Sequence, residues 1–336
     1  MVGRGDLMAA GPGRTVSVRV LVALLALALV VGAVGGITLL ETVRGDAPAG
    51  STGGTAAPPG PDTASTVPPP PSTSAVDGAT PSDRGDAGPS STGVPDGTTL
   101  TPYTGPSTIT APGTVIEAKE ITSCLVIKAD DVTIKNSLLT GSCLFHVLSD
   151  NGNTRLQLSD VEFDGRGNPA NDSAVNGGGY TCLRCDVHGT VDGFKAGTGV
   201  TIQDSWIHDL TIAGDSHNDG IQSLGTTQLA ITGNTIVLAD GATSAVILST
   251  GSATEMRNVT ITDNLLGGGA FTVYGGYEAG SDTRSKVSDI AITDNRFSTR
   301  IYPRSGAYGP LTSTDAPVSV SGNTWADGPN AGKPLA

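Results

Sequence analysis

Two short segments in the middle of the chain carry the residues best suited to chemistry. Asp192–Lys195 and Asp219–Gln222 share the order acidic, glycine, apolar, polar, and the second follows a polar run that contains Asp215 and His217. If the two segments lie side by side, their carboxylates, the lysine, the histidine and the glutamine form one polar patch. We take this patch as the candidate site, with His217 as a further candidate catalytic residue.

Strand alternation predicts where the side chains of these segments point. If Phe194 and Ile221 face a core, alternation sends Lys195 and Gln222 outward, and the intervening glycines leave room beside them. Asn218 is expected on the same outer face, with the preceding loop carrying its acidic and histidine side chains over the patch. The alternative is that the Asp-Gly pairs are turn residues beside a solvated surface.

The elements that must position this patch come from a repeat. After residue 105, short β-prone runs recur at intervals that vary along the chain, which is typical of a solenoid with loops of different length. The runs are Val132–Ile134, Leu156–Leu158, Tyr180–Cys182, Val200–Ile202, Leu229–Ile231, Val259–Ile261, Ile290–Ile292 and Val318–Val320. Scarce aromatic residues (4%) and 47 glycines favour short strands and tight turns over a helical bundle.

A second column lies three residues after each run and ends in Asn234, Asn264, Asn295 and Asn323. Asparagine tolerates the left-handed backbone of a sharp turn, and stacked amides can hydrogen-bond to one another. Apolar residues resume after this column, and several repeats add a third run that includes the two Asp-Gly segments. Short strands, corners and an asparagine column predict an all-β, single-stranded right-handed parallel β-helix of about eight rungs.

Four of these repeats resemble rungs of the pectate-lyase-like superfamily. They are Val200–Leu210, Leu229–Ile236, Val259–Leu266 and Ile290–Phe297, and the resemblance covers roughly residues 110–327. Members of that superfamily are mostly polysaccharide lyases and glycoside hydrolases, with some esterases, phage tailspikes and adhesins. The resemblance implies a carbohydrate ligand without naming a reaction, because one fold hosts many sites.

The resemblance implies a role for four residues of the patch. Lyases of the superfamily abstract the proton beside a uronate carboxylate with a lysine or arginine, often with Ca²⁺ on nearby acids. Lys195 resembles that base, and Asp192, Asp215 and Asp219 would be calcium ligands. The expected function is therefore a polysaccharide lyase that acts by β-elimination on a uronate-containing polysaccharide. A lysine base needs a lowered pKa, which the acids oppose unless a metal neutralises them.

Two other functions fit the same patch. A glycoside hydrolase would use Asp192 and Asp219 as its acid and base, because stacked neighbours would lie about 5 Å apart, within the range that such enzymes use. The signature motifs of polygalacturonase-like hydrolases are not found around these residues. A non-catalytic polysaccharide-binding or cell-surface adhesion module is the third reading.

A set of tyrosines and arginines toward the C-terminus adds candidate binding residues. Aromatic faces stack on sugar rings, and arginine pairs with carboxylates in two-point contacts. With two polar residues of the patch, the expected substrate-binding residues are Asn218, Gln222, Tyr274, Tyr277, Arg300, Tyr302, Arg304 and Tyr308. The alternative is that the tyrosines pack loops against the last rungs and the arginines offset nearby acids.

The N-terminal region predicts export. Residues 20–40 are uncharged and long enough as a helix to span a bilayer core of about 30 Å, and arginines before them favour an N-terminus inside. We expect a cytoplasmic segment at 1–19, a transmembrane signal-anchor or cleaved signal peptide at 20–40, a disordered Pro/Ser/Thr/Gly-rich linker at 41–104, and the β-helix domain at 105–336. The domain would be extracytoplasmic, membrane-anchored or secreted.

The net charge limits the kinds of partner that we expect, and the cysteines indicate the cellular compartment. A net charge of −13 and no basic run in the last two thirds exclude nucleic acid as an expected partner. Cys124 and Cys143 occur in matching contexts, so they are expected to stack on neighbouring rungs and form a disulfide. Cys182 and Cys185 could bond only across a tight corner, because three residues of extended strand separate them by about 10 Å.

Overall fold

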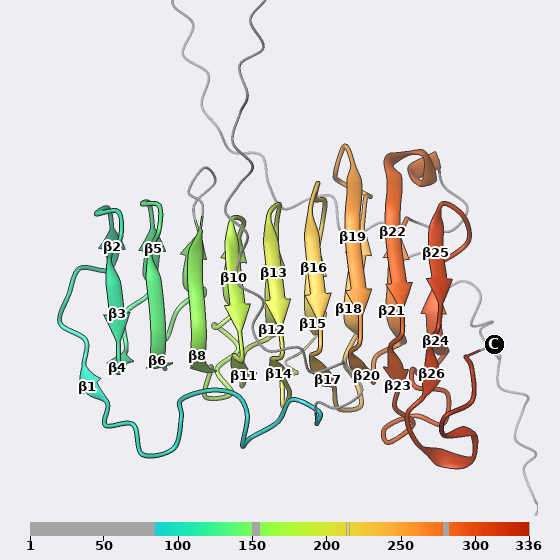
Figure 1. The fold of residues 1–336 in the computed structure, drawn as a ribbon, viewed down its shortest axis with the longest axis horizontal. Coiled ribbons are helices and arrows are strands. Elements are labelled where there is room, and N and C mark those ends of the chain that lie inside the picture. Colours follow the sequence, from blue (N-terminus) through green and yellow to red (C-terminus); the bar gives the residue numbers. More distant parts are fainter. Residues whose placement is uncertain (1–84, 150–154, 213, 215, 278–281, 336) are drawn as a thin grey trace, which may run out of the picture. The chain divides into compact units, whose positions relative to one another are not determined.

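The computed structural model describes residues 85–149, 155–212, 214, 216–277 and 282–335 (Figure 1). The described part is all-β with parallel strands, as expected, and its helical content is two short 3-10 turns at Asp282–Lys286 and Gly328–Asn330. The expected membrane span at 20–40 and most of the expected linker lie outside the described residues. Within the described ranges, no helix is long and apolar enough to cross a membrane.

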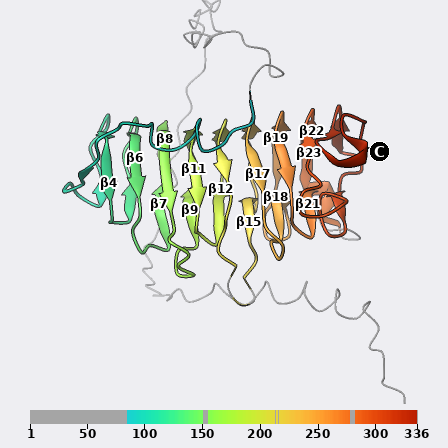
Figure 2. The same cartoon turned by 90° about the horizontal axis from the view of Figure 1, so that it is seen from below.

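The described strands form two long parallel sheets (Figures 1 and 2). Sheet A has seventeen strands: β1 Thr101–Pro102, β3 Val115–Glu117, β4 Lys119–Ile121, β6 Thr133–Leu139, β8 Leu156–Asp164, β10 Tyr180–Leu183, β11 Asp186–His188, β13 Val200–Gln203, β14 Trp206–Ile207, β16 Leu229–Thr232, β17 Thr235–Val237, β19 Met256–Thr262, β20 Leu265–Gly267, β22 Val287–Thr293, β23 Arg296–Phe297, β25 Val318–Ser321 and β26 Thr324–Trp325. Sheet B has nine: β2 Thr108–Ile109, β5 Leu125–Ile127, β7 Phe145–Ser149, β9 Ser173–Gly177, β12 Asp192–Ala196, β15 Asp219–Ser223, β18 Ser244–Ser249, β21 Phe271–Gly276 and β24 Gly309–Thr312. The chain passes through sheet A and then sheet B in each repeat, which is compatible with a parallel β-helix; we call one such pass a rung.

Apolar side chains from both sheets fill the space between them. On sheet A, the last residues of the first seven predicted runs form an inward column that is 0–1% exposed: Ile134, Leu158, Cys182, Ile202, Ile231, Ile261 and Ile292. Val320 of the eighth run is exposed. Sheet B contributes a facing column of Val147, Val175, Phe194, Ile221, Val246 and Val273, each 0% exposed. Burying one such side chain contributes roughly 1.5–3 kcal/mol, so the repeated columns hold the rungs together.

The corners of sheet A correct one detail of the asparagine prediction. The left-handed backbone falls on the residue before the asparagine column, at Asp204, Gly233, Asp263, Asp294 and Gly322 among others. The asparagines themselves are buried and form the expected ladder. The side-chain amide of Asn234 donates to Asn264 Oδ1 (3.0 Å), that of Asn264 to Asn295 Oδ1 (2.9 Å), and that of Asn295 to Asn323 Oδ1 (3.0 Å). We call these four residues the asparagine ladder.

Both cysteine pairs are disulfide-bonded. Cys124 and Cys143 lie on neighbouring rungs with Cα atoms 5.5 Å apart, as predicted. Cys182 and Cys185 are joined across a corner, with Cα atoms 6.0 Å apart. The tight corner that this bond requires is present, because Arg184 between them adopts a positive φ of 51°.

Residues 85–100 form a strap that crosses sheet A before β1, drawn in cyan in Figure 1. Asp86 pairs with Arg296, and the backbone N–H of Gly93 donates to the carbonyl of Arg184 (2.9 Å). A side chain at position 93 would meet Asp186, because an added Cβ would lie 2.9 Å from the Asp186 Cβ. The packed structure therefore begins earlier than the expected domain boundary at residue 105.

Candidate functional site

The two Asp-Gly segments lie side by side at the start of strands β12 and β15 in sheet B. The strands pair in parallel with Phe194 opposite Ile221, and the backbone N–H of Asp219 donates to Asp192 Oδ1 (2.9 Å). A serine continues the line on each side, since Ser173 lies opposite Asp192 and Ser244 opposite Asp219. We call these four residues, Ser173, Asp192, Asp219 and Ser244, the acidic column; each is 0–2% exposed.

The glycines turn the aspartates toward the outer side. In a regular strand, residues three apart point to opposite faces, yet Lys195 Nζ lies 3.3 Å from Asp192 Oδ2. Gly193 explains this contact, because a Cβ there would lie 2.9 Å from the buried Ile207 Cγ2, so position 193 faces the interior. Gly220 repeats the arrangement in the next rung. The sequence had suggested that the glycines leave room on the outer side. In the structure they face the core instead.

Lys195 is held by two carboxylates. Its Nζ lies 2.6 Å from Asp172 Oδ2 and 3.3 Å from Asp192 Oδ2, and its side chain is 27% exposed. Burial alone would lower the pKa of Lys195, but the hydrogen bonds and charges of Asp172 and Asp192 outweigh burial, so the pKa is raised. Lys195 therefore keeps its proton in this arrangement, which opposes the expected role as a base.

Asp192 and Asp219 have raised pKa values. Burial, followed by the charge of Asp219, raises the pKa of Asp192 to about 7, against the opposing effects of the Asp219 N–H and Lys195. Burial raises the pKa of Asp219 to about 6, although hydrogen bonds from Ser244 and Gln222 lower it. Two neighbouring carboxyl groups that titrate near neutral pH can share one proton, leaving one as an acid and the other as a base.

Every carboxylate oxygen of this pair already accepts a hydrogen bond or pairs with a cation. Besides the contacts from Asp219 N–H and Lys195, Ser244 Oγ donates to Asp219 Oδ1 (2.5 Å) and Gln222 Nε2 to Asp219 Oδ2 (3.3 Å). Ca²⁺ takes several oxygen ligands, so its binding at this pair would have to replace some of these contacts. Among the described residues, no group of three or more His, Cys, Asp or Glu is arranged to hold a metal ion. Asp215 lies outside the described residues, so the calcium set stays a prediction.

The loop before β15 places the other predicted residues differently. His217 is exposed at the end of this loop. Asn218 is 0% exposed, and its amide donates to the carbonyls of Val191 (2.7 Å) and Thr211 (2.6 Å). Asn218 therefore fixes the loop to the previous rung and does not point to the outer face as expected.

An aromatic cluster continues the site along sheet B. Tyr274 occupies the same outward column as Lys195, three rungs along, through register pairs that join positions 195, 222, 247 and 274. The register of Val246 with Val273 places Phe271 on the line of the acidic column, one rung beyond Ser244. Its ring centroid lies 5.7 Å from that of Tyr274 and 5.8 Å from that of Tyr308. We call Phe271, Tyr274 and Tyr308 the aromatic platform.

The remaining predicted residues divide into two groups. Tyr302 and Arg304 lie on the loop that carries Tyr308; the Tyr302 hydroxyl donates to Asp240, and Arg304 Nη2 donates to the Ala307 carbonyl (3.1 Å). Tyr277 and Arg300 are engaged elsewhere. The buried Tyr277 hydroxyl contacts Arg284 Nη2 (3.0 Å) and accepts from the Asp315 N–H (3.1 Å), while Arg300 Nε lies 3.7 Å from Asp327 Oδ2.

Sequence reasoning did not identify Asp172, Ser244 or Phe271 as part of the site. Phe271 could have been found, because Phe271–Tyr274 aligns with the two Asp-Gly segments once the third run of each repeat is superposed. Asp172 gave no such signal, since it precedes its strand and reaches Lys195 only through the pairing of β9 with β12.

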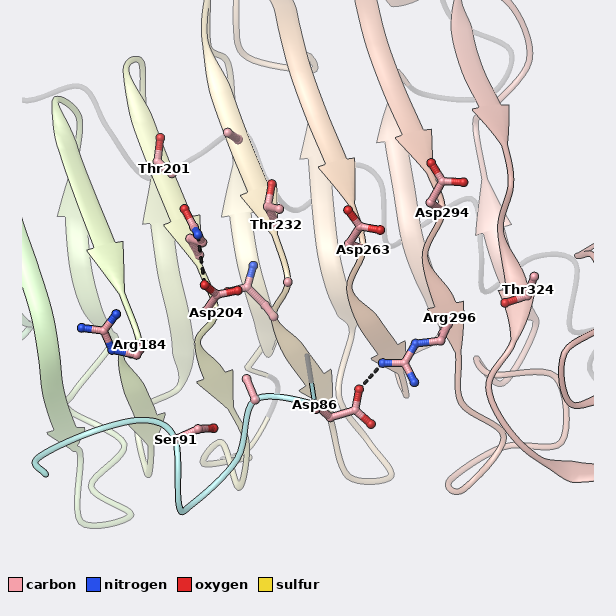
Figure 3. Close-up of a pocket in the computed structure, with 16 residues that line it drawn as sticks. Asp86, Ser91, Arg184, Thr201, Asp204, Thr232, Asp263, Asp294, Arg296 and Thr324 are labelled. Atoms are coloured by element: carbon pink, nitrogen blue, oxygen red, sulfur yellow. Dashed lines mark hydrogen bonds and ion pairs between the residues drawn. The ribbon is translucent and has the colours of Figure 1, made fainter. Parts of the chain in front are cut away.

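A cavity of about 1020 Å³ lies away from this site, between the strap and the corners of sheet A (Figure 3). Asp204, Gly233, Asp263 and Asp294 line it from four successive corners. Arg296, which pairs with Asp86 of the strap, lines its side. No residue of the acidic column or the aromatic platform lines this cavity. It is therefore a separate feature of the fold.

Comparison with known proteins yields no relative for this chain. No family model matches the sequence, and no curated protein or solved structure matches it either. The geometry of the site is therefore the basis for a function.

Proposed function

We propose that this domain is a glycoside hydrolase that uses Asp192 and Asp219 as its carboxyl pair. The observation that carries the proposal is the juxtaposition of two buried carboxyl groups whose pKa values are raised to about 7 and about 6. Hydrolysis of a glycosidic bond needs one carboxylic acid and one carboxylate at the same pH. Asp192, with the higher pKa, is the proton donor to the leaving oxygen, and Asp219 acts as the carboxylate.

We further infer that the fold is a right-handed parallel β-helix of the pectate-lyase-like kind. Two long parallel sheets, sharp corners and the asparagine ladder support this inference, and crossovers between parallel strands are almost always right-handed. The two disulfides support export of the domain, because such bonds persist in oxidising compartments. A polysaccharide is the substrate that such a surface would meet outside the cell.

The ionisation of Lys195 favours hydrolysis over elimination. A lysine base must be neutral, whereas Asp172 and Asp192 stabilise the protonated form of Lys195. Lys195 and Gln222 instead cover the two carboxyl groups, since the Asp192 side chain is 3% exposed beneath the lysine. Sugar hydroxyl groups would have to replace these contacts when a substrate binds.

The test is the release of reducing ends by the full chain from a panel of polysaccharides. We expect Asp192→Asn and Asp219→Asn each to lose about 10²–10⁴-fold in kcat, the usual contribution of a positioned acid or base. Asp263→Asn, at a corner of sheet A, is the matched control and should keep full activity. Activity that survives both site substitutions would refute the proposal. Ultraviolet absorbance from an unsaturated product would show elimination instead.

A further inference from the structure

The cations near the acidic column are already neutralised. Lys195 contacts both Asp172 and Asp192, so this part of the outer surface of sheet B has no net positive charge to offer a ligand. Asp219 adds negative charge here, and Asp240, which accepts from Tyr302, adds it beside the loop that carries Tyr308. A polyanionic sugar chain would meet repulsion here, because complementary interfaces pair positive with negative potential.

The aromatic platform offers a different means of binding. Tyr308 is 65% exposed, yet its backbone is fixed, since its N–H donates to the Ala270 carbonyl (2.8 Å) and the next residue pairs with Phe271 in sheet B. The loop before it is anchored by the buried Ser305, whose Oγ lies 2.9 Å from Thr272 Oγ1. An exposed ring on a fixed backbone can stack on a sugar with little loss of conformational entropy.

The position of the platform relative to the carboxyl groups sets the direction of a bound chain. Phe271 lies two rungs beyond Asp219 in the same line, which corresponds to about 10 Å at the usual strand spacing. Tyr274 lies three rungs beyond Lys195, at about 14 Å. A sugar chain that runs across successive strands of sheet B can therefore reach both the carboxyl pair and the platform.

We propose that the substrate is an uncharged polysaccharide that stacks on Phe271, Tyr274 and Tyr308 while its scissile bond lies over Asp192 and Asp219. This rests on the proposed hydrolase function and departs from the uronate substrate expected from the sequence. Recognition depends on aromatic stacking and not on ion pairing, so it should be insensitive to salt.

The test is affinity electrophoresis of the full chain in native gels, with the double variant Asp192→Asn/Asp219→Asn to prevent cleavage. The neutral probes are hydroxyethylcellulose, dextran and galactomannan, and the acidic probe is polygalacturonate. We expect retention by at least one neutral probe, unchanged by salt. Tyr308→Ala should weaken it about three- to tenfold, whereas Tyr308→Phe, which keeps the ring, should retain the wild-type affinity.

Three results would overturn the proposal: stronger, salt-sensitive retention by polygalacturonate, neutral retention that Tyr308→Ala leaves unchanged, or no retention by any probe. The test also separates this proposal from the hydrolase function, because binding is measured without cleavage. Retention that depends on Tyr308, combined with no release of reducing ends by the unsubstituted chain, would leave the subsite in place and refute the reaction.

Discussion

The asparagine ladder and the acidic column both bury polar side chains along successive rungs, but they differ in how burial affects those side chains. Both are lines of buried polar side chains that pass from rung to rung, one at the corners of sheet A and the other at the start of the sheet B strands. In the ladder, neutral amides donate and accept, so each buried group has a partner. In the acidic column, two neighbouring carboxyl groups are 1–2% exposed and resist ionisation.

The energetic difference between the two lines is large. Burial raises the pKa of Asp192 from 3.8 to about 7, which corresponds to about 4 kcal/mol of opposition to ionisation. A satisfied amide hydrogen bond instead contributes about 1 kcal/mol to stability. Strongly shifted pKa values of buried groups are typical of functional sites, which retain them at the expense of stability. The comparison supports a structural role for the ladder and the proposed catalytic role for the acidic column.

The strongest test of this contrast is Asp192→Asn, which should lose activity and gain stability. Activity should fall about 10²–10⁴-fold, because an amide cannot donate the proton. The free energy of unfolding at about pH 8 should rise by at most about 4 kcal/mol, because the buried charge is removed while Asn Oδ1 can still accept from the Asp219 N–H. Chemical denaturation and reducing-end assays on the same preparation measure both effects. A less stable variant with full activity would make the acidic column a structural feature.

The asparagine ladder should respond in the opposite sense. Asn264→Ala removes the amide contacts with Asn234, Asn295 and the Ile231 carbonyl, and should reduce the free energy of unfolding by about 3 kcal/mol. The kcat of the folded fraction should not change, since the ladder lies on the other sheet. Asn323→Ala, at the end of the ladder, provides the graded control and should lose less. Equal losses at both positions would show that the ladder does not act as a connected line.

The sequence predicts the ladder and the acidic column only as far as their residues belong to a pattern that repeats along the chain. The inward columns recur in almost every repeat and the ladder asparagines in the last four, so periodicity alone locates them. To locate the acidic column, Asp192 and Asp219 must be placed on neighbouring strands, and the shared Asp-Gly pattern predicted that placement. Its neighbour Asp172 and the strap contact between Asp86 and Arg296 depend on residues far apart in the chain that carry no repeat signal.

The outcome at Asn218 shows a different limit. Its type and place suggested an outward, substrate-binding side chain, but its amide donates to the carbonyl of Val191 in the previous rung and to that of Thr211 in its own loop. Which carbonyls lack a partner is decided by the path of the loop, and loop paths are not encoded by periodicity. The corners of sheet A show the same limit. The left-handed backbone was expected at the asparagine, but it lies at the residue before it.

The acidic column also predicts how stability depends on pH. Asp192 and Asp219 have folded pKa values above the unfolded value of about 3.9, so the folded state binds more protons between these values. Stability from this pair should be greatest below about pH 4 and should fall as the pH rises through about 6 and 7. The difference in unfolding free energy between the wild type and the double variant Asp192→Asn/Asp219→Asn isolates this contribution from other groups, including Asp131, whose hydrogen bond to Arg155 lowers its pKa and acts in the opposite sense. A flat difference curve would contradict the raised pKa values.

The smallest expected effect comes from Lys195, and it separates the two mechanisms. The charge of Lys195 lowers the pKa of Asp192, so Lys195→Met should raise that pKa above about 7. If Asp192 is the general acid, the alkaline limb of the kcat/KM profile should move upward by up to about one pH unit, while Lys195→Arg keeps the limb in place. An enzyme that uses Lys195 as its base would instead lose activity at every pH in the Met variant. One outcome is a shift of the pH profile and the other is a loss of activity at every pH. This substitution therefore tests whether Asp192 is the general acid or Lys195 is the general base.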